Sequence, residues 1–412
     1  TCGASLGNTY GTPVIRRLHN GNWAAIFGNG FGSANGDAGV FIMLIDSSGN
    51  TTFYYLSTGI GSGTPPSSTA NGIAYVSAVD LDADRITDYV YAGDLQGNVW
   101  RFDLTSNLPS AWAVTPNPIF SNPGQPITSA PVVVATPGTG NAPHVMVEFG
   151  TGRQVPQSLI SAATYQTSQQ AIYGIWDWNM ASWNSKSSTK FAVPFTARSL
   201  PTGRNPLVSS TGTLVQQVIN PPTAATAANT GSNYRTIQTS AVCFGDVSGC
   251  SSNGWFMNLV FGFPNASDPS VPQATAAVPS ATTLYEQVLF NPVLVLGALV
   301  VNTTIPPQTS ATSCYSAAAS GWTMAIDPAT GGSFASSFFE DGSPNHNVLS
   351  VNDSSGNVAV SGLALGGTGS FSTVQYQTQY YGITQTTTSP FIGAINPPGN
   401  LKGKRVTWIQ KR

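Results

Sequence analysis

The chain has 412 residues, of which 41% are hydrophobic and only 8% carry a charge. Its net charge of −2 and isoelectric point near 5.8 argue against nucleic-acid binding, because phosphate neutralisation needs clustered Lys and Arg. The 43 glycines, the 29 prolines and the absence of a long helix-period stretch indicate an all-β chain that can bury a substantial core.

One pattern recurs along the chain: a run of β-forming residues, then Asp or Asn, then a turn that contains Gly. Six copies are legible, at Phe41–Asn50, Val99–Leu104, Ile172–Trp178, Trp255–Leu259, Trp322–Gly331 and Phe391–Gly399. Repetition of one small sheet is typical of a β-propeller, and the competing fold is an array of β-sandwiches. We predict a single β-propeller domain over residues 1–412.

The blade count depends on a seventh copy of the turn chemistry, which we place around Val348–Leu365. With it, we predict seven irregular blades of antiparallel strands, and six or eight blades remain alternatives.

Residues 80–88 form the most informative segment, because Asp80, Asp82, Asp84 and Asp88 fall within nine positions of a chain that is poor in charge. A calcium ion takes six to eight oxygen ligands, with side chains at loop positions 1, 3, 5 and 9 and a backbone carbonyl at position 7. Those positions are the four aspartates and Ile86. We therefore predict a Ca²⁺ site here, and the alternative is a solvated acidic turn without a metal.

The loop differs from a helix–loop–helix calcium hand, since Arg85 stands where Gly is usual and Tyr91 where a bidentate Glu is usual. The flanking segments Ala74–Val79 and Tyr89–Tyr91 are typical of strands. We expect the loop to join two strands.

Four cysteines, an even number, suggest an oxidising compartment. Cys243 and Cys250 enclose a short turn-like segment, so we pair them and leave Cys2 with Cys314. Three connectivities are open from the sequence.

Two later segments carry further expectations. The apolar run Val288–Val301 is interrupted by Asn291, Pro292 and Gly297, so it predicts a buried hairpin and no membrane span. Gly367–Ser389 predicts a surface loop whose tyrosines are a candidate contact surface, and a solvated loop without a partner is the alternative.

The run Asp80–Leu104 resembles the PilC/PilY family, the type IV pilus tip-associated adhesins. The likeness extends to Trp23–Gly30, Phe149–Arg153, Gly254–Leu259 and Gly403–Trp408. The resemblance implies that this propeller is the C-terminal domain of a larger protein. It also implies that the loop ligands Asp80, Asp82, Asp84, Ile86 and Asp88 hold calcium.

The same resemblance implies regulation of pilus extension and retraction, with twitching motility and surface attachment as outcomes. Its implied partners are pilin subunits or other pilus components and a host or abiotic surface. Its implied location is the cell surface, at the pilus tip or the outer membrane, reached through the periplasm.

The alternative function is an enzyme, because Gly93–Asp103 also resembles the blade motif of quinoprotein (PQQ-dependent) dehydrogenases. Those enzymes usually carry adjacent cysteines near the cofactor, and this sequence has none. His19, His144 and His346 are isolated in the sequence, and no nucleophile motif accompanies them. Nothing selects Asp246, Glu286 or Glu340 as a glycosidase pair. We therefore expect a binding domain and no enzyme.

Overall fold

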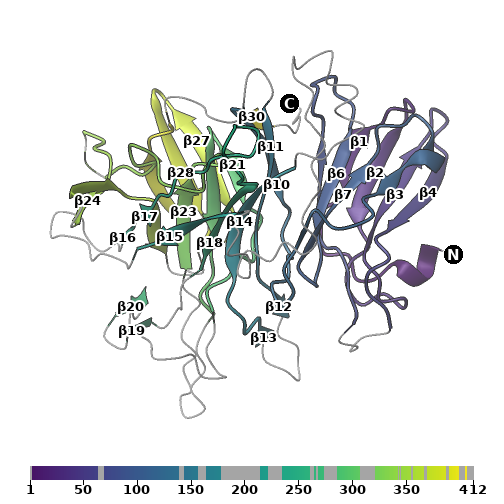
Figure 1. Cartoon of the computed structure of the whole chain (residues 1–412), viewed down its shortest axis with the longest axis horizontal. Coiled ribbons are helices and arrows are strands. Elements are labelled where there is room, and N and C mark those ends of the chain that lie inside the picture. Colours follow the sequence, from purple (N-terminus) through teal and green to yellow (C-terminus); the bar gives the residue numbers. More distant parts are fainter. Residues whose placement is uncertain are drawn as a thin grey trace, which may run out of the picture.

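The computed structural model confirms an all-β chain (Figure 1). It describes residues 2–63, 69–138, 143–155, 164–177, 214–220, 234–259, 264–265, 268–272, 285–306, 321–341, 343, 345–353, 356–365, 369–386, 389–398 and 404–405. The helices of these segments are two short 3-10 turns, η1 (Cys2–Ser5) and η2 (Pro109–Ala111). In this part of the chain, no helix has the length and apolar character needed to cross a membrane.

Five sheets of three or more strands stand in chain order across the described part (Figure 1). The first two sheets consist of nine strands. Sheet one has β1 (Val14–Arg17), β2 (Trp23–Gly28), β3 (Gly39–Ile45) and β4 (Thr51–Ser57). Sheet two has β5 (Val76–Val79), β6 (Tyr89–Gly93), β7 (Asn98–Asp103), β8 (Ala113–Val114) and β9 (Phe120–Ser121), the last two both pairing with β7.

The third sheet has seven strands and the fourth has five. In spatial order, sheet three has β17 (Ile237–Gln238), β15 (Val215–Ile219), β18 (Gly254–Asn258), β14 (Ala171–Trp176), β11 (His144–Gly150), β10 (Val132–Thr136) and β30 (Lys404–Arg405). Sheet four has β16 (Tyr234–Arg235), β26 (Gly362–Leu365), β23 (Gly321–Ile326), β22 (Ala298–Asn302) and β21 (Val293–Val295).

The fifth sheet has β27 (Phe371–Tyr376), β28 (Gln379–Thr384) and β29 (Phe391–Ile395). Three two-stranded ribbons complete the described strands: β12 (Gln154–Val155) with β13 (Thr164–Tyr165), β19 (Pro264–Asn265) with β20 (Asp268–Pro272), and β24 (Ser350–Asp353) with β25 (Gly356–Ala359).

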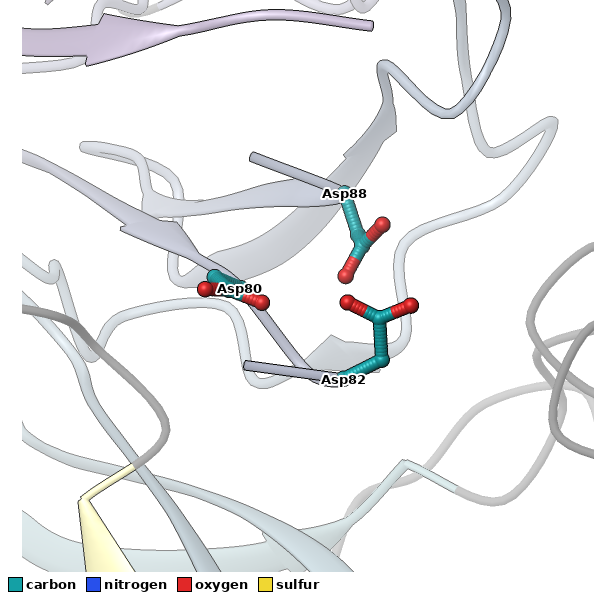
Figure 2. Close-up of side chains that lie close together, drawn as sticks. All are labelled: Asp80, Asp82 and Asp88. Atoms are coloured by element: carbon teal, nitrogen blue, oxygen red, sulfur yellow. The ribbon is translucent and has the colours of Figure 1, made fainter. Parts of the chain in front are cut away.

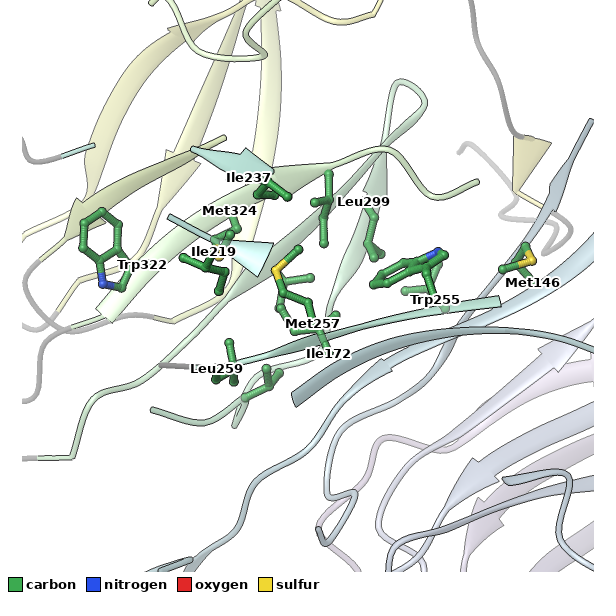
Figure 3. Close-up of a cluster of buried hydrophobic side chains, with 14 of the residues drawn as sticks. Met146, Ile172, Ile219, Ile237, Trp255, Met257, Leu259, Leu299, Trp322 and Met324 are labelled. Atoms are coloured by element: carbon green, nitrogen blue, oxygen red, sulfur yellow. The ribbon is translucent and has the colours of Figure 1, made fainter. Parts of the chain in front are cut away.

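A separate hydrophobic core fills each gap between consecutive sheets. Ile42 and Trp100 share the core between sheets one and two, and Tyr91 and Val147 share the next. Figure 3 shows the core between sheets three and four, where Trp255 and Met324 are among the buried side chains. The inner sheets are thus covered on both faces, which is why β6, β11, β14 and β23 are buried at every position.

The six repeat copies all contain strands, and in five of them the strand has the same position within its sheet. The copies in β3, β7, β14, β23 and β29 are each the third strand of a consecutive hairpin series. The Trp255 copy is β18, which adds to the sheet of β14 and forms no sheet of its own. In the Val348–Leu365 copy, β24 and β25 form a ribbon and β26 joins β23. Seven blades stays a prediction.

Two details correct the expected pattern. Strand β15 runs parallel to β18, whereas the other pairs of named strands are antiparallel. A parallel neighbour needs a long crossover, and the chain between Ile219 and Gly254 provides one. The expected loop at Gly367–Ser389 is also wrong in form, because β27 and β28 pair within it as a hairpin. Tyr376, the last residue of β27, is 66% exposed.

Two other expectations are confirmed. Strands β21 and β22 form the hairpin within Val288–Val301, and its two turn residues, Leu296 and Gly297, have φ of 48° and 92°. The Cys243–Cys250 disulfide is present. The other proposed pair falls outside the described residues, because Cys314 is not among them.

One fully buried ion pair lies in sheet four. The Arg235 guanidinium donates to both carboxylate oxygens of Glu286 at 2.7 Å, and both side chains are 0% exposed. The Arg235 guanidinium also lies 4.0 Å from the centre of the Trp322 ring. Neither charge could remain in this core without the other, because an isolated buried ion is strongly disfavoured.

Replacing Arg235 with Met is therefore expected to lower the free energy of unfolding by about 3–5 kcal/mol, measured by chemical denaturation. The Arg235→Met, Glu286→Leu double variant should recover much of this loss, because it leaves no uncompensated charge. A double variant that is less stable than Arg235→Met would contradict the assignment.

Candidate metal centre

The predicted calcium loop joins β5 to β6, as expected. The last pair of the hairpin is Val79 with Tyr89, and the amide of Asp88 donates to the carbonyl of Val79 at 2.9 Å. The carbonyl of Asp88 accepts from Leu104 at 2.9 Å, which ties the end of the loop to the segment after β7. The two ends of the loop are thus fixed by backbone hydrogen bonds, while the middle residues are exposed.

Three of the predicted ligands converge in this loop. Asp80, Asp82 and Asp88 each offer a carboxylate oxygen, and these oxygens lie within 4.8 Å of one another. Figure 2 shows the carboxylates of Asp82 and Asp88 facing each other with Asp80 beside them. Asp88 is 1% exposed and Asp80 is 9% exposed, so two of the three charges are held at the edge of the core.

The other two predicted ligands have different contacts. The Asp84 side chain is exposed and stands outside the group of three, and its carboxylate accepts the Ile86 amide at 2.8 Å. The ligand role of Asp84 and that of the Ile86 carbonyl both stay predictions. Asp80 shapes the turn between them, because its two oxygens accept the amides of Asp84 at 3.2 Å and Arg85 at 2.7 Å.

The backbone enters the left-handed region twice within the loop. Ala83 has φ of 63° and Arg85 has φ of 71°. Position 6 is where the calcium hand uses Gly, and the turn in this chain demands the same conformation from Arg85. Arg85 thus replaces the usual Gly at position 6 and keeps the left-handed backbone conformation.

Sequence reasoning missed the contribution of sheet one to this loop. The imidazole Nε2 of His19, in the connection between β1 and β2, lies 3.0 Å from one oxygen of Asp88. The Arg17 carbonyl accepts the Thr87 amide at 2.9 Å. His19 is 69 positions from Asp88 and has no local motif, so only the packing of the two sheets could reveal the pair.

Burial, with a smaller contribution from like charge, raises the pKa values of Asp80 and Asp84. Burial raises the pKa of Asp80 to about 6, and the charges of Asp88 and Asp84 add to the rise against the lowering effect of the Arg85 amide. Burial also raises the pKa of Asp84, and Asp82 and Asp88 act in the same direction. The carboxylates are therefore held in an arrangement that favours a bound cation or proton.

Of the remaining candidates for chemistry, His144, Asp246, Glu286 and Glu340 have structural partners and Glu148 has no hydrogen bond. His144 lies in β11, and its Nε2 is 2.7 Å from Asp246, whereas Glu148 on the same strand is 0% exposed without a hydrogen bond. Glu286 is held by Arg235, and Glu340 accepts from Gln379 at 2.9 Å. His144 and Glu148, four positions apart on β11, therefore form no pair, and Asp246 contacts the imidazole instead.

The fold and the loop together define a β-propeller domain with an acidic strand connection. The model of the PilY1 beta-propeller domain matches residues 2–193, which include the whole loop. The crystal structure of the Pseudomonas aeruginosa PilY1 C-terminal domain has a TM-score of 0.66 and 24% identity, covering 96% of this chain and 73% of that chain. That likeness confirms the propeller fold.

Named relatives agree with the match to the PilY1 model. The type IV pilus biogenesis factor PilY1 of Pseudomonas aeruginosa PAO1 is 28% identical over 97% of this chain and 32% of its own length. A PilY1 homolog of Xylella fastidiosa is 35% identical over 42% of this chain and 12% of its own length. The chain thus spans about a third or less of these relatives. The resemblance to the PilC/PilY family is confirmed, and residues 2–193 are the part that matches the PilY1 beta-propeller model.

The raised pKa of Asp80 predicts a pH dependence of stability in the domain stripped of any metal by a chelator. A carboxyl whose folded pKa is raised favours folding below its unfolded pKa, and this contribution is lost as pH rises through about 6. The stripped domain should therefore melt at a higher temperature at about pH 5 than at about pH 7 because of this group.

The Asp80→Asn variant is the control, measured by thermal unfolding at the same two pH values. It should show a smaller difference between them, because the titrating group is gone. An unchanged difference would assign the pH dependence to other residues.

The left-handed conformation of Arg85 predicts that Arg85→Gly stabilises the domain by up to about 1 kcal/mol. Gly adopts a positive φ without a steric penalty. Part of this gain is lost because Gly gives the unfolded chain more conformational freedom. Chemical denaturation of Arg85→Gly beside Arg85→Ala separates backbone from charge. Equal stabilisation by both variants would refute the conformational explanation.

Proposed function

We propose that this domain binds calcium through the β5–β6 loop and serves as a regulatory, adhesin-like part of a type IV pilus biogenesis factor. The observation that carries the proposal is the convergence of the Asp80, Asp82 and Asp88 carboxylates within 4.8 Å. Three like charges at this distance repel one another, and the attraction of each to a divalent cation would outweigh that repulsion.

Calcium suits the donor set better than zinc. The predicted ligands are all oxygen atoms on a partly exposed loop, whereas structural zinc sites use thiolates and imidazoles. Asp80, Asp82 and Asp88 would hold the ion, with Asp84 and the Ile86 carbonyl as the further ligands that the spacing predicts. His19 would orient Asp88 from the neighbouring sheet through their 3.0 Å contact.

Calcium would act on the domain by fixing a connection between two sheets. The loop contacts sheet one through His19 and through the Arg17 carbonyl, so neutralising its carboxylates would stabilise that junction. In the whole protein, we propose that calcium occupancy regulates pilus extension and retraction, and hence twitching motility and surface attachment. Its partners would be pilus components and the surface contacted, at the pilus tip or outer membrane.

The domain would act by binding and without catalysis. The relatives are named as pilus biogenesis factors. The described titratable residues considered for hydrolysis, Asp246, Glu286 and Glu340, each have their own structural partner. The alternative, a quinoprotein-like dehydrogenase, would instead require saturable binding of a quinone cofactor by the purified domain.

Calorimetric titration of the calcium-stripped domain is expected to show saturable calcium binding, with magnesium binding more weakly. The Asp82→Asn variant should weaken calcium affinity by at least about tenfold, because it removes one charged ligand from a half-exposed position where folding is least at risk.

Asp46→Asn is the matched control, because Asp46 also sits in a strand connection and accepts backbone amides at 2.8 Å but lies outside the cluster. Its calcium affinity should equal that of the parent. Absence of calcium binding by the parent at millimolar concentration, or equal affinity in the Asp82 variant, would refute the site.

A further inference from the structure

A cavity of about 270 Å³ lies between strands of four sheets. Its walls come from β1, β5, β10 and β21 and from the residues just before them, and these are the opening strands of the hairpin series in sheets one to four. In a propeller, such strands surround the central channel. The cavity is therefore axial, and it is distinct from the carboxylate cluster because none of Asp80, Asp82 and Asp88 lines it.

The walls are mostly apolar, and several of the polar lining groups are already used. Val14, Val76, Val132 and Leu294 are among the apolar lining residues. The Ser77 hydroxyl donates to the Pro131 carbonyl, and the Asn291 side chain accepts the Ala130 amide at 2.8 Å. These two bonds join neighbouring opening strands, so they hold the cavity open as part of the fold.

Arg16 is the single charged residue among those that line the cavity. Its guanidinium donates to the carbonyl of its neighbour Ile15 at 2.9 Å and has no ion pair within the described part of the chain. Burial lowers the pKa of Arg16, which means that its surroundings disfavour the positive charge. An anion beside Arg16 would compensate that cost, since guanidinium binds carboxylate through paired hydrogen bonds.

We propose that the axial cavity binds a small carboxylate with a short apolar body, with Arg16 contacting the carboxylate and the aliphatic walls covering the rest. The volume is slightly below the range usual for drug-sized ligands, which limits the ligand to a short chain or a single side chain. The same chemistry is offered by a free aliphatic acid and by the C-terminal residue of a peptide.

The test uses hexanoate and a Gly-Gly-Leu peptide as probes, with hexylamine and the amidated peptide as controls, in calorimetric titration of the whole domain. At least one carboxylate probe should bind saturably, and neither control should. Arg16→Gln is expected to weaken binding by about tenfold or more, because a hydrogen bond to a charged group is lost. Whichever probe binds identifies the source of the carboxylate.

Arg17→Gln is the matched control, because Arg17 is the next residue of β1 and does not line the cavity. It should bind the probes like the parent. Ala130→Leu, which fills the cavity from its wall, should abolish binding while the domain stays folded by circular dichroism.

Titrations with calcium and with chelator keep this proposal separate from the metal centre, because the cavity contains none of the clustered aspartates. Absence of carboxylate binding, or equal affinity in Arg16→Gln and the parent, would overturn the proposal whatever the outcome for calcium.

Discussion

Burial of both faces of the inner sheets is the constraint on which the rest of this structure depends. A sheet between two others has no face for charged side chains, which agrees with a charged fraction of only 8%. Two ion pairs enter the interior, through the 2.7 Å contacts of Arg101 with Asp177 and of Arg235 with Glu286, whereas Glu148 is buried without a hydrogen bond. Polar chemistry is therefore confined to the strand connections and to the cavity on the propeller axis.

The acidic loop and the axial cavity are the two places where polar groups gather, one exposed and anionic, the other enclosed and cationic. The loop places three carboxylates together at the end of a hairpin, where water and a cation can reach them. The cavity places one guanidinium among aliphatic walls, where an anion gains most from excluding water. The cavity takes its walls from four sheets, whereas the predicted metal ligands lie in one strand connection that His19 contacts from the neighbouring sheet.

The sequence was sufficient for the features that depend on neighbouring residues. The glycine and proline content and the lack of a helix-period stretch predicted the all-β class, and the repeat predicted strands that the structure contains. The spacing of the aspartates predicted a cluster, of which Asp80, Asp82 and Asp88 come together. The hairpin at Val288–Val301 could be predicted because its interruption contains a turn residue, Gly297.

Features that depend on packing between sheets were beyond the sequence. His19 is isolated in the chain, and its contact with Asp88 exists only because sheet one lies against sheet two. Likewise, the sequence around β27 and β28 is rich in Ser and Thr, a composition typical of loops, so it does not indicate that these strands form a hairpin. The place of Trp255 in the sheet of β14 was hidden because a similar local motif can occupy a different strand position.

The short strand β1 also bears on how this domain can be divided. Within and just after its four residues lie the cavity cation Arg16, the Arg17 carbonyl that holds Thr87, and the imidazole of His19. A fragment that begins after His19 would keep every predicted metal ligand in its own sequence. It would nevertheless lack the backbone acceptor and the imidazole that fix the loop, so the smallest autonomous unit for this chemistry includes both of the first two sheets.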